Sequence, residues 1–279
     1  MINHNSKTQK SIAIIGGKGQ MGQMINHFLA NDPNLVVHLI DKDDSIFDSQ
    51  YKQFDLVLIS VPIAHTNSII EATAKKLSRD CILCDFTSIK TQPLKCMLNS
   101  HTGPVIGLHP MFGPTITETK NQVIIHCPGR SQNKYQWFLD LLQKLGFQIE
   151  TMDANEHDQL MNFIQGVEHF STFCLGSFLK EQSVDLAKLL KLASPVYQME
   201  LNILGRLFYQ SAELYADIIA SDEKRIELLE AYADHIKEMA LSLKAGKRDA
   251  FIQRFEAIRN QMGEFCQSAY EKTDQTLTK

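Results

Sequence analysis

The chain has 279 residues, of which 44% are hydrophobic and 22% charged, a composition typical of a folded globular protein. Its net charge of −4, with both signs interspersed, argues against the basic surface of a nucleic-acid-binding protein. No apolar run reaches the roughly 18 residues that a membrane span needs, and the polar start MINHNSKTQK does not resemble a signal peptide. We therefore expect a cytoplasmic protein that binds neither nucleic acid nor membrane.

Over the first half of the chain, short apolar runs rich in β-forming residues alternate with helical stretches. The runs are continuously apolar, which is typical of parallel strands covered on both faces. The expected strands are Ser11–Ile15, Leu35–Ile40, Asp55–Ser60, Cys81–Phe86, Val105–Leu108, Gln122–Cys127 and Gln148–Met152. The expected helices are Gln20–Ala30, Thr66–Leu77, Thr87–Leu98 and Gln132–Leu145. This alternation predicts a Rossmann-type, doubly wound α/β domain over residues 11–152, preceded by a polar tail of residues 1–10.

From Asp153 onward the strands stop and helical periodicity takes over. Helices are expected at Asp153–Lys180, Glu223–Leu243 and Asp249–Tyr270, the last two with apolar residues three and four positions apart. We therefore expect an all-helical second domain over residues 153–279, which binds substrate and joins two copies in a homodimer.

The chain has six cysteines, and two of them, Cys81 and Cys84, form a CxxC pair that zinc and redox sites also use. This pair lies inside the apolar run CILCDF, and alternation along a strand directs the two side chains to opposite faces. We therefore expect buried structural cysteines, no metal and no disulfide.

The motif IIGGKGQMG lies between the first expected strand and the first expected helix. Its Gly17, Gly19 and Gly22 make the G-x-G-x-x-G pattern of dinucleotide-binding sites. The first glycine permits a tight turn, the second lets the backbone approach a pyrophosphate, and the third allows helix and strand to pack closely. The N–H groups that open the helix, at Gln20 and Met21, then face the phosphates.

Two further segments complete the expected cofactor site. Asp41 ends the second strand, where a carboxylate accepts hydrogen bonds from a ribose 2′-hydroxyl and repels a 2′-phosphate, so NAD is favoured over NADP. Lys42 beside it partly offsets that charge. The third strand is followed by Ser60, Val61 and Pro62, which we expect to line the cofactor cleft.

His109 follows the run PVIGL and opens the rigid segment HPMFGP. A histidine held there can take a proton near neutral pH, although a loop histidine with a local hydrogen bond is an equal alternative. Ser88 and Lys90, in DFTSIK, follow the neighbouring strand and so emerge at the same sheet edge. Ser88 can orient His109 or touch substrate, while Lys90 is either a substrate contact or a solvated residue at a helix start.

The helical half offers a second group of candidates. Asn162, Gln165 and His169 form a polar stripe on the helix expected at Asp153–Lys180, where a ligand can supply their partners. Arg206 stands among apolar neighbours, so we expect it to pair either with a substrate carboxylate or with Glu200.

These motifs resemble the prephenate dehydrogenase family, in particular the dehydrogenase part of the bifunctional chorismate mutase–prephenate dehydrogenases. The resemblance covers nearly the whole chain and runs through IIGGKGQMG, ISVPI, DFTSIK, GLHPMFGP, YQWFL, EHDQLMNFIQ, SPVYQMELNILGRLF and LYADII. It implies oxidative decarboxylation of prephenate by NAD to 4-hydroxyphenylpyruvate on the route to tyrosine.

The resemblance also implies roles for particular residues. His109 takes the proton of the substrate's ring hydroxyl, Ser88 orients the two groups, His169 contacts substrate near the nicotinamide, and Arg206 binds a substrate carboxylate. Tyrosine is an expected inhibitor in the substrate pocket. The short stretch before the first strand leads us to expect no mutase domain, and Glu168 stands where close relatives are expected to carry a basic residue.

Three other functions remain open from the residues alone. An NAD-dependent 3-hydroxy-acid dehydrogenase would use a lysine of the helical half, such as Lys180 or Lys191, and would leave HPMFGP unexplained. An arogenate dehydrogenase would differ only in the side chain of its substrate. A module that senses NAD(H) without turnover would bind cofactor but would not depend on His109.

Overall fold

The structure, a computed structural model, describes residues 9–44 and 47–277, so most of the expected tail of residues 1–10 lies outside the described residues. The chain divides into two compact units, Met1–Met161 and Asn162–Lys279, called here the α/β unit and the helical unit. The α/β unit includes the helix α6 (Ala154–Met161), which the sequence assigns to the second domain. The expected boundary at residues 152/153 stays a prediction.

The α/β unit is built on one seven-stranded sheet in the order β2-β1-β3-β4-β5-β6-β7. The strands are β1 (Lys10–Ile15), β2 (Leu35–Ile40), β3 (Leu56–Ile59), β4 (Ile82–Asp85), β5 (Val105–Pro110), β6 (Val123–Arg130) and β7 (Gln148–Thr151). Strands β1 to β5 are parallel, β6 runs antiparallel to β5, and β7 runs parallel to β6. The sheet is thus the expected doubly wound type with one reversed strand, and all seven expected strands are present.

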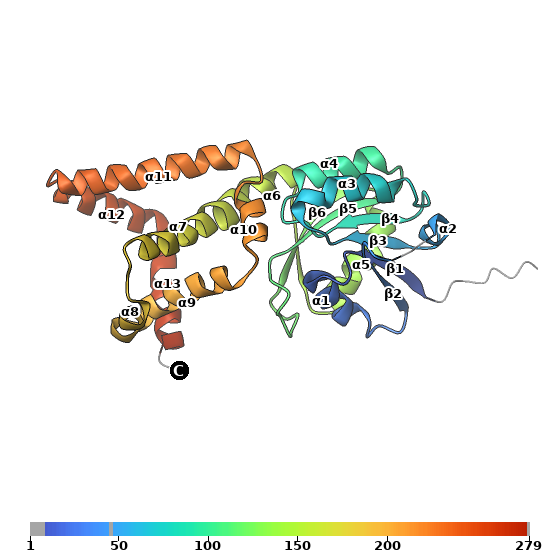
Figure 1. Ribbon diagram of the computed structural model, residues 1–279, viewed down its shortest axis with the longest axis horizontal. Coiled ribbons are helices and arrows are strands. Elements are labelled where there is room, and N and C mark those ends of the chain that lie inside the picture. The colour runs from blue at the N-terminus through green and yellow to red at the C-terminus, as the bar shows by residue number, and fades with distance from the viewer. Residues whose placement is uncertain (1–8, 45–46, 278–279) are drawn as a thin grey trace, which may run out of the picture. The chain divides into compact units, whose positions relative to one another are not determined.

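Helices cover both faces of this sheet (Figure 1). One core cluster joins the sheet to α1 (Gln20–Leu29) and α5 (Gln132–Lys144). The other joins it to α3 (Ile63–Ala74), α4 (Thr91–Ser100) and α6. A short helix, α2 (Asp48–Tyr51), contributes Tyr51 to the second cluster. Because both faces are buried, the strands read as unbroken apolar runs.

The helical unit differs from expectation at two places where the helical path changes. The long helix expected at Asp153–Lys180 contains a π-helical turn, η1 (Asn162–Val167), between α6 and α7 (Glu168–Glu181). The helix expected at Asp249–Tyr270 is two helices, α12 (Arg248–Met262) and α13 (Glu264–Leu277). They are separated by Gly263, whose φ of +54° suits glycine and ends the first helix.

The remaining helices of this unit are α8 (Leu186–Leu192), α9 (Pro195–Tyr209), α10 (Ala212–Ile219) and α11 (Glu223–Lys244). Four begin at a side-chain cap, because Asp185, Ser194, Ser211 and Asp222 each accept a backbone N–H of the first turn. Helix α7 packs against α9, and α11 packs against η1 and α12.

Cys81 and Cys84 are buried on opposite faces of the sheet, as the alternation predicts, since each belongs to a different core cluster. Among the described residues, no helix has the length and apolar character needed to cross a bilayer. In the same part of the chain, no group of three or more His, Cys, Asp or Glu side chains is arranged to hold a metal ion.

Candidate active site

The glycine-rich loop joins β1 to α1 at the carboxyl edge of the sheet. A side chain at Gly17 would put its Cβ 2.7 Å from the carbonyl oxygen of Ile14, and one at Gly22 would lie 2.6 Å from the backbone of Gly16 and Gly17. Both glycines are therefore required by close backbone packing. The turn itself uses Gly16, which sequence reasoning passed over, with a φ of +78°. The doubled glycine of IIGGKG was the available signal.

Gly19 has a different reason to be glycine. Its φ of −68° is open to any residue, and a Cβ there would approach only the carbonyl oxygen of Gly16, at 3.1 Å. The space beside it is thus not filled by protein. Gly19 is the N-cap of α1, which has no side-chain cap and no acidic residue in its first turn. A helix start with unsatisfied N–H groups and no competing carboxylate fits a pyrophosphate.

Asp41 and Ser60 lie beside this loop, because β1, β2 and β3 end level with one another: Ile15 pairs with both Ile40 and Ile59. The carboxylate of Asp41 is half-buried and accepts hydrogen bonds from the backbone N–H groups of Lys18 (3.3 Å) and Lys42 (2.9 Å). Its direction is therefore set by the loop. Backbone N–H donors for the pyrophosphate and a carboxylate acceptor for the ribose thus lie at one end of the sheet, and the residues present fit NAD.

The side chain of Lys42 is exposed, and the nearby ion pair is made by Lys18 with Asp44, at 2.6 Å. The hydrogen bond to Asp44 raises the pKa of Lys18. Ser60, followed by Val61 and Pro62 at the end of β3, donates its backbone N–H to Ile15. The same residue packs its carbonyl against Gly16.

His109 lies on β5, not in the loop after it, because β6 continues the sheet and pairs Ile125 with His109. The expectation of a loop histidine was wrong for this reason. The side chain is 2% exposed, and its Nδ1 lies 2.8 Å from Nε2 of His157. A strand position with one ring nitrogen engaged holds the imidazole in a single orientation.

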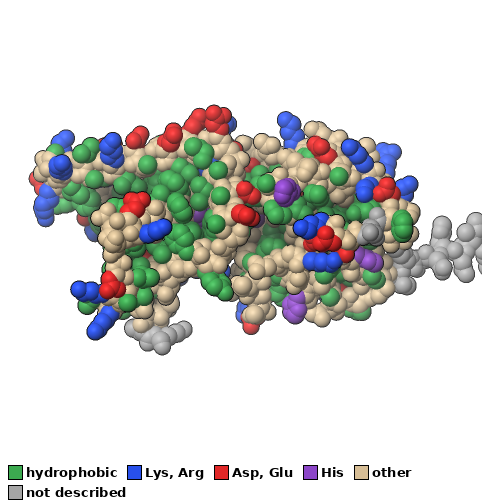
Figure 2. Space-filling view, viewed as in Figure 1, with side chains coloured by type: hydrophobic (Ala, Val, Ile, Leu, Met, Phe, Trp, Pro, Cys, Tyr) green, Lys and Arg blue, Asp and Glu red, His purple; other side chains and the backbone are tan. Residues whose placement is uncertain are grey.

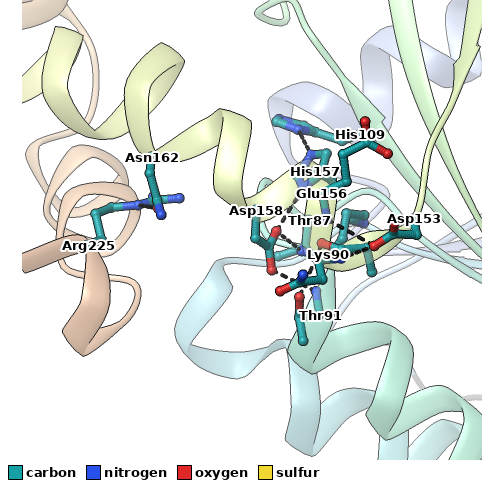
Figure 3. A network of polar contacts seen from close by, with 12 residues as sticks. Thr87, Lys90, Thr91, His109, Asp153, Glu156, His157, Asp158, Asn162 and Arg225 are labelled. Atoms are coloured by element: carbon teal, nitrogen blue, oxygen red, sulfur yellow. Dashed lines mark hydrogen bonds and ion pairs between the residues drawn. The ribbon is translucent and has the colours of Figure 1, made fainter. Parts of the chain in front are cut away.

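His157 and Asp158 belong to α6 and were not among the expected site residues. Nδ1 of His157 lies 2.7 Å from Oδ1 of Asp158, and that carboxylate also accepts the backbone N–H groups of Lys90 and Thr91, both at 2.8 Å (Figure 3). Asp158 therefore also caps the start of α4. The segment EHD carries this pair in the sequence, but nothing in the local pattern ties it to a strand so far along the chain.

The expected solvated position of Lys90 was wrong, because the residue is fully buried. Its ammonium forms an ion pair with Asp85 and also donates to the carbonyl of Leu108 at 2.8 Å. Ser88 is half-buried in the loop between β4 and α4. Asp85, Lys90 and Ser88 thus follow one strand end, with Lys90 engaged in holding β4 against β5. The catalytic role of Ser88 and the substrate role of Lys90 stay predictions.

The helical unit gathers a second polar cluster around Tyr215. The ring of His169 meets that of Tyr215 edge-on with centroids 4.9 Å apart, and Nδ1 of His169 contacts Oε2 of Glu168. Gln210 donates to the Tyr215 hydroxyl at 2.9 Å. Burial is the main cause that raises the pKa of Tyr215; the charge of Glu168 adds to it, and that of Arg206 opposes it. His169 and Arg206 therefore lie near the same hydroxyl.

Arg206 is exposed, although its apolar neighbours in sequence suggested burial, because α9 is amphipathic and turns this side chain outward. It makes no ion pair with Glu200, so that alternative is wrong. The buried arginine of the helical unit is Arg225. Its Nε donates to Oδ1 of Asn162 at 2.9 Å, so Asn162 has a protein partner and needs no ligand (Figure 3). Gln165 is half-buried in η1, and its substrate role stays a prediction.

Comparisons with known proteins agree with this arrangement. Residues 29–150 match the family profile described as prephenate dehydrogenase, nucleotide-binding domain, and residues 153–257 match prephenate dehydrogenase, dimerization domain. The chain is 42% identical over 256 residues to the T-protein of Enterobacter agglomerans, covering 91% of this chain and 68% of that protein. It is 38% identical over 274 residues to the T-protein of Haemophilus influenzae, covering 98% and 72%.

Among solved structures, a prephenate dehydrogenase from A. aeolicus in complex with hydroxyphenyl propionate and NAD+ has the same fold. Its TM-score is 0.69 at 17% identity, with 92% of this chain and 99% of that chain covered. The glycine loop precedes the residues matched by the nucleotide-binding profile, so its geometry is an independent argument for the cofactor. Together these findings show that the chain belongs to the prephenate dehydrogenase family and is an NAD-dependent oxidoreductase.

Proposed function

We propose that this chain oxidises and decarboxylates prephenate with NAD, giving 4-hydroxyphenylpyruvate, carbon dioxide and NADH, with His109 as the catalytic base. The observation that carries the proposal is the position of His109. It lies at the carboxyl end of β5, in the same parallel set of strands whose ends form the cofactor loop, with Nδ1 held by His157. An imidazole held in one orientation at the end of a strand can present a ring nitrogen to the substrate.

The cofactor is assigned to the edge of the sheet. Gly17, Gly19 and Gly22 form the loop, the N–H groups of Gln20 and Met21 face the pyrophosphate, and Asp41 accepts the ribose hydroxyls. The segment Ser60–Val61–Pro62 lines the remaining side. When bound, NAD accepts the hydride that leaves the ring carbon bearing the hydroxyl.

His109 accepts a proton from the substrate's ring hydroxyl and later gives it back to the same oxygen. As hydride leaves, the hydroxyl proton passes to His109 and the carbon–oxygen bond becomes a carbonyl. Loss of carbon dioxide then sends its bonding electrons into the ring, the ring becomes aromatic, and the phenolate oxygen takes the proton back from His109. The balance needs no metal and no further base. A neutral imidazole matched to near-neutral pH suits both transfers.

Arg206 and His169 are assigned to the substrate. A guanidinium binds a carboxylate through two parallel hydrogen bonds. Arg206 is exposed, and no carboxylate of the described residues forms an ion pair with it. Its contribution is binding, because a tight grip on the departing carboxylate would stabilise the ground state. The tyrosine side chain shares the phenol of the product, so we further propose that tyrosine inhibits by occupying the same site.

We also propose that two copies associate through the helical unit. Helix α12 contains no buried residue, yet Phe251, Phe255, Ile258 and Met262 recur at three- and four-residue spacing, and each is about half exposed. Figure 2 shows apolar side chains gathered over one face of this unit. Such a stripe needs a partner, and the matching profile is that of a dimerization domain. A cytoplasmic location stays a prediction.

The test is NADH formation by the purified protein with prephenate and NAD, beside a His109→Asn variant. We expect turnover by the wild type and a loss of at least about 100-fold in kcat in the variant, with NAD affinity unchanged. Unchanged turnover in His109→Asn would reject the assigned base. Arogenate, offered as second substrate, and NAD binding without turnover test the two alternative functions.

The same assay tests the substrate residues. Arg206→Gln should raise KM for prephenate more than it lowers kcat, and the reverse split would reject a binding role. Tyrosine should compete with prephenate, and a purely non-competitive pattern would place tyrosine elsewhere.

A further inference from the structure

The strongest unassigned feature is a line of three side chains in the α/β unit that ends at His109. From Asp158 the line runs 2.7 Å to His157 and a further 2.8 Å to Nδ1 of His109 (Figure 3). The ring of His157 is 0% exposed and that of His109 is 2% exposed, so water does not mediate the line. The two rings cross at 69° with centroids 5.0 Å apart, so they meet edge to face and are not stacked.

The positions of the hydrogens along this line can be assigned from Asp158, which accepts at one end of it. Asp158 accepts the backbone N–H groups of Lys90 and Thr91 as well as His157. Burial alone would raise the pKa of Asp158, but the hydrogen bonds from His157, Thr91 and Lys90 outweigh it and hold the pKa at about 2. Asp158 is therefore a carboxylate and can only accept. Nδ1 of His157 must carry the hydrogen between them.

The remaining hydrogen lies between the two rings. We assign it to Nδ1 of His109, so that Nε2 of His157 accepts it. This leaves the lone pair of His109 on Nε2. An imidazole without such partners can carry its hydrogen on either nitrogen. The tautomer of His109 is therefore set by its two partners on α6, His157 and Asp158.

We propose that His157 and Asp158 are positioning residues for the proposed reaction: they hold His109 as the tautomer whose Nε2 is the base, and they take up the positive charge while the substrate's proton is held. The inference rests on the proposed function of His109. When Nε2 binds the hydroxyl proton, the Nδ1 proton moves to Nε2 of His157. The cation then lies beside the carboxylate of Asp158, and both shifts reverse when the phenolate takes its proton back.

The surrounding charges support this path. Lys90 is the cation closest along the chain of contacts, and its charge is neutralised by its ion pair with Asp85. Two further acidic residues lie at the start of α6: Asp153, which precedes the helix and caps its first turn, and Glu156. The half-buried carboxylate of Asp158 is a favourable neighbour for a transient imidazolium on His157. The proton returns to the substrate and does not pass to solvent, which suits two histidines that are both buried.

The first variants separate the two roles of His157. His157→Phe keeps a ring but can neither accept nor donate, and His157→Gln can accept from His109 through its amide oxygen. We expect kcat to fall about 100-fold in His157→Phe and to recover in part in His157→Gln, with KM for prephenate changed less than about threefold. The acid limb of the kcat/KM profile should move to lower pH in His157→Phe, because Nδ1 of His109 loses its acceptor.

The controls separate folding from function. His101 is also a buried histidine of the α/β unit, bonded to the carbonyl of Cys81, and His101→Phe should leave kcat per folded molecule within about threefold. The only tryptophan, Trp137 on α5, reports folding of this unit by fluorescence. Nitrogen NMR of labelled histidines should show His109, assigned through His109→Asn, protonated at Nδ1 in the wild type.

The outcomes are distinct. A folded His157→Phe with wild-type kcat and pH profile, beside an inactive His109→Asn, would overturn this inference alone. An active His109→Asn would overturn the proposed base and the inference with it. An Nε2-protonated His109 in the wild type would contradict the assigned tautomer.

Discussion

The two units of this chain bury their apolar residues to very different degrees. Among the described residues, the buried apolar core lies almost wholly in the α/β unit; the helical unit contributes only Leu201, Leu207, Ile218 and Leu229. The large apolar side chains that remain exposed are distributed the opposite way. All but Val36, Phe47 and Leu160 belong to the helical unit.

This contrast follows from architecture. A sheet covered on both faces closes its core within one chain, whereas a helix buries only one stripe and needs a neighbour for it. The α/β unit therefore has the means to close its own core and to hold the glycine loop and His109 in place. The helical unit carries apolar surface whose burial requires a partner, and we propose that this partner is a second copy. Four predictions test that contrast, from the largest expected effect to the smallest.

The largest effect should come from charging the stripe on α12. In the double variant Phe255→Glu/Ile258→Glu each copy loses two apolar contacts, and symmetry doubles the loss in a dimer. Hot-spot residues cost about 2 kcal/mol or more each, so we expect monomers at micromolar concentration, measured by light scattering. Gln253→Glu/Asn260→Glu adds the same charge to the opposite side of α12 and should leave the mass unchanged. A dimer that survives the first variant would show that another face joins the copies.

A smaller but still large effect is expected inside the α/β unit, at the ion pair of Lys90 and Asp85. Lys90→Met leaves the Asp85 carboxylate buried and uncompensated, which should cost about 3–5 kcal/mol in the free energy of unfolding. Urea unfolding followed by Trp137 fluorescence measures it. Adding Asp85→Asn should recover much of the loss, since the stranded charge is removed. If instead Lys90→Met leaves stability intact and raises KM for prephenate, Lys90 is a substrate contact and the pair is not structural.

The fate of Lys90 shows where sequence reasoning succeeds and where it stops. All seven strands could be predicted, because continuous apolar runs and glycine turns are local signals. The positions of the glycine loop and of Asp41 after β2 could be predicted for the same reason. The burial of Lys90 could not, because it depends on the packing of β4 against β5, where its ammonium meets the carbonyl of Leu108. His157 and Asp158 could not, because their partners lie far along the chain and depend on how α6 packs against α4 and β6. The exposed position of Arg206 was missed because apolar neighbours in sequence do not tell which side of an amphipathic helix is covered.

A third prediction concerns acid sensitivity of the α/β unit alone. Burial lowers the pKa of His126 to about 4. Between pH 6.5 and 4 this histidine therefore binds a proton in the unfolded chain but not in the folded unit. Stability should therefore fall by about 2–3 kcal/mol as the pH drops from 6.5 to 4. In His126→Asn this contribution is absent, and its stability deficit against the wild type, read at Trp137, should shrink over that range. His27→Asn, at an exposed site, should keep a constant difference; a constant deficit in His126→Asn would mean that the histidine is not buried neutral.

The smallest effect is expected at the edge of the α/β unit, where the site meets solvent and no core is disturbed. Asp41→Asn keeps the shape of the side chain but removes the charge that attracts ribose hydroxyls and repels a 2′-phosphate. Charge-assisted hydrogen bonds contribute about 1.5–3 kcal/mol, so KM for NAD should rise about tenfold and the preference over NADP should shrink by at least as much. Asp43→Asn removes the same charge from the exposed neighbouring loop and should change neither constant by more than about twofold. The amide oxygen of Asp41→Asn can still accept the N–H groups of Lys18 and Lys42. Both variants should therefore have the free energy of unfolding of the wild type. Equal effects of the two substitutions would mean that NAD is selected by the general field of the acidic loop and not by a contact with Asp41.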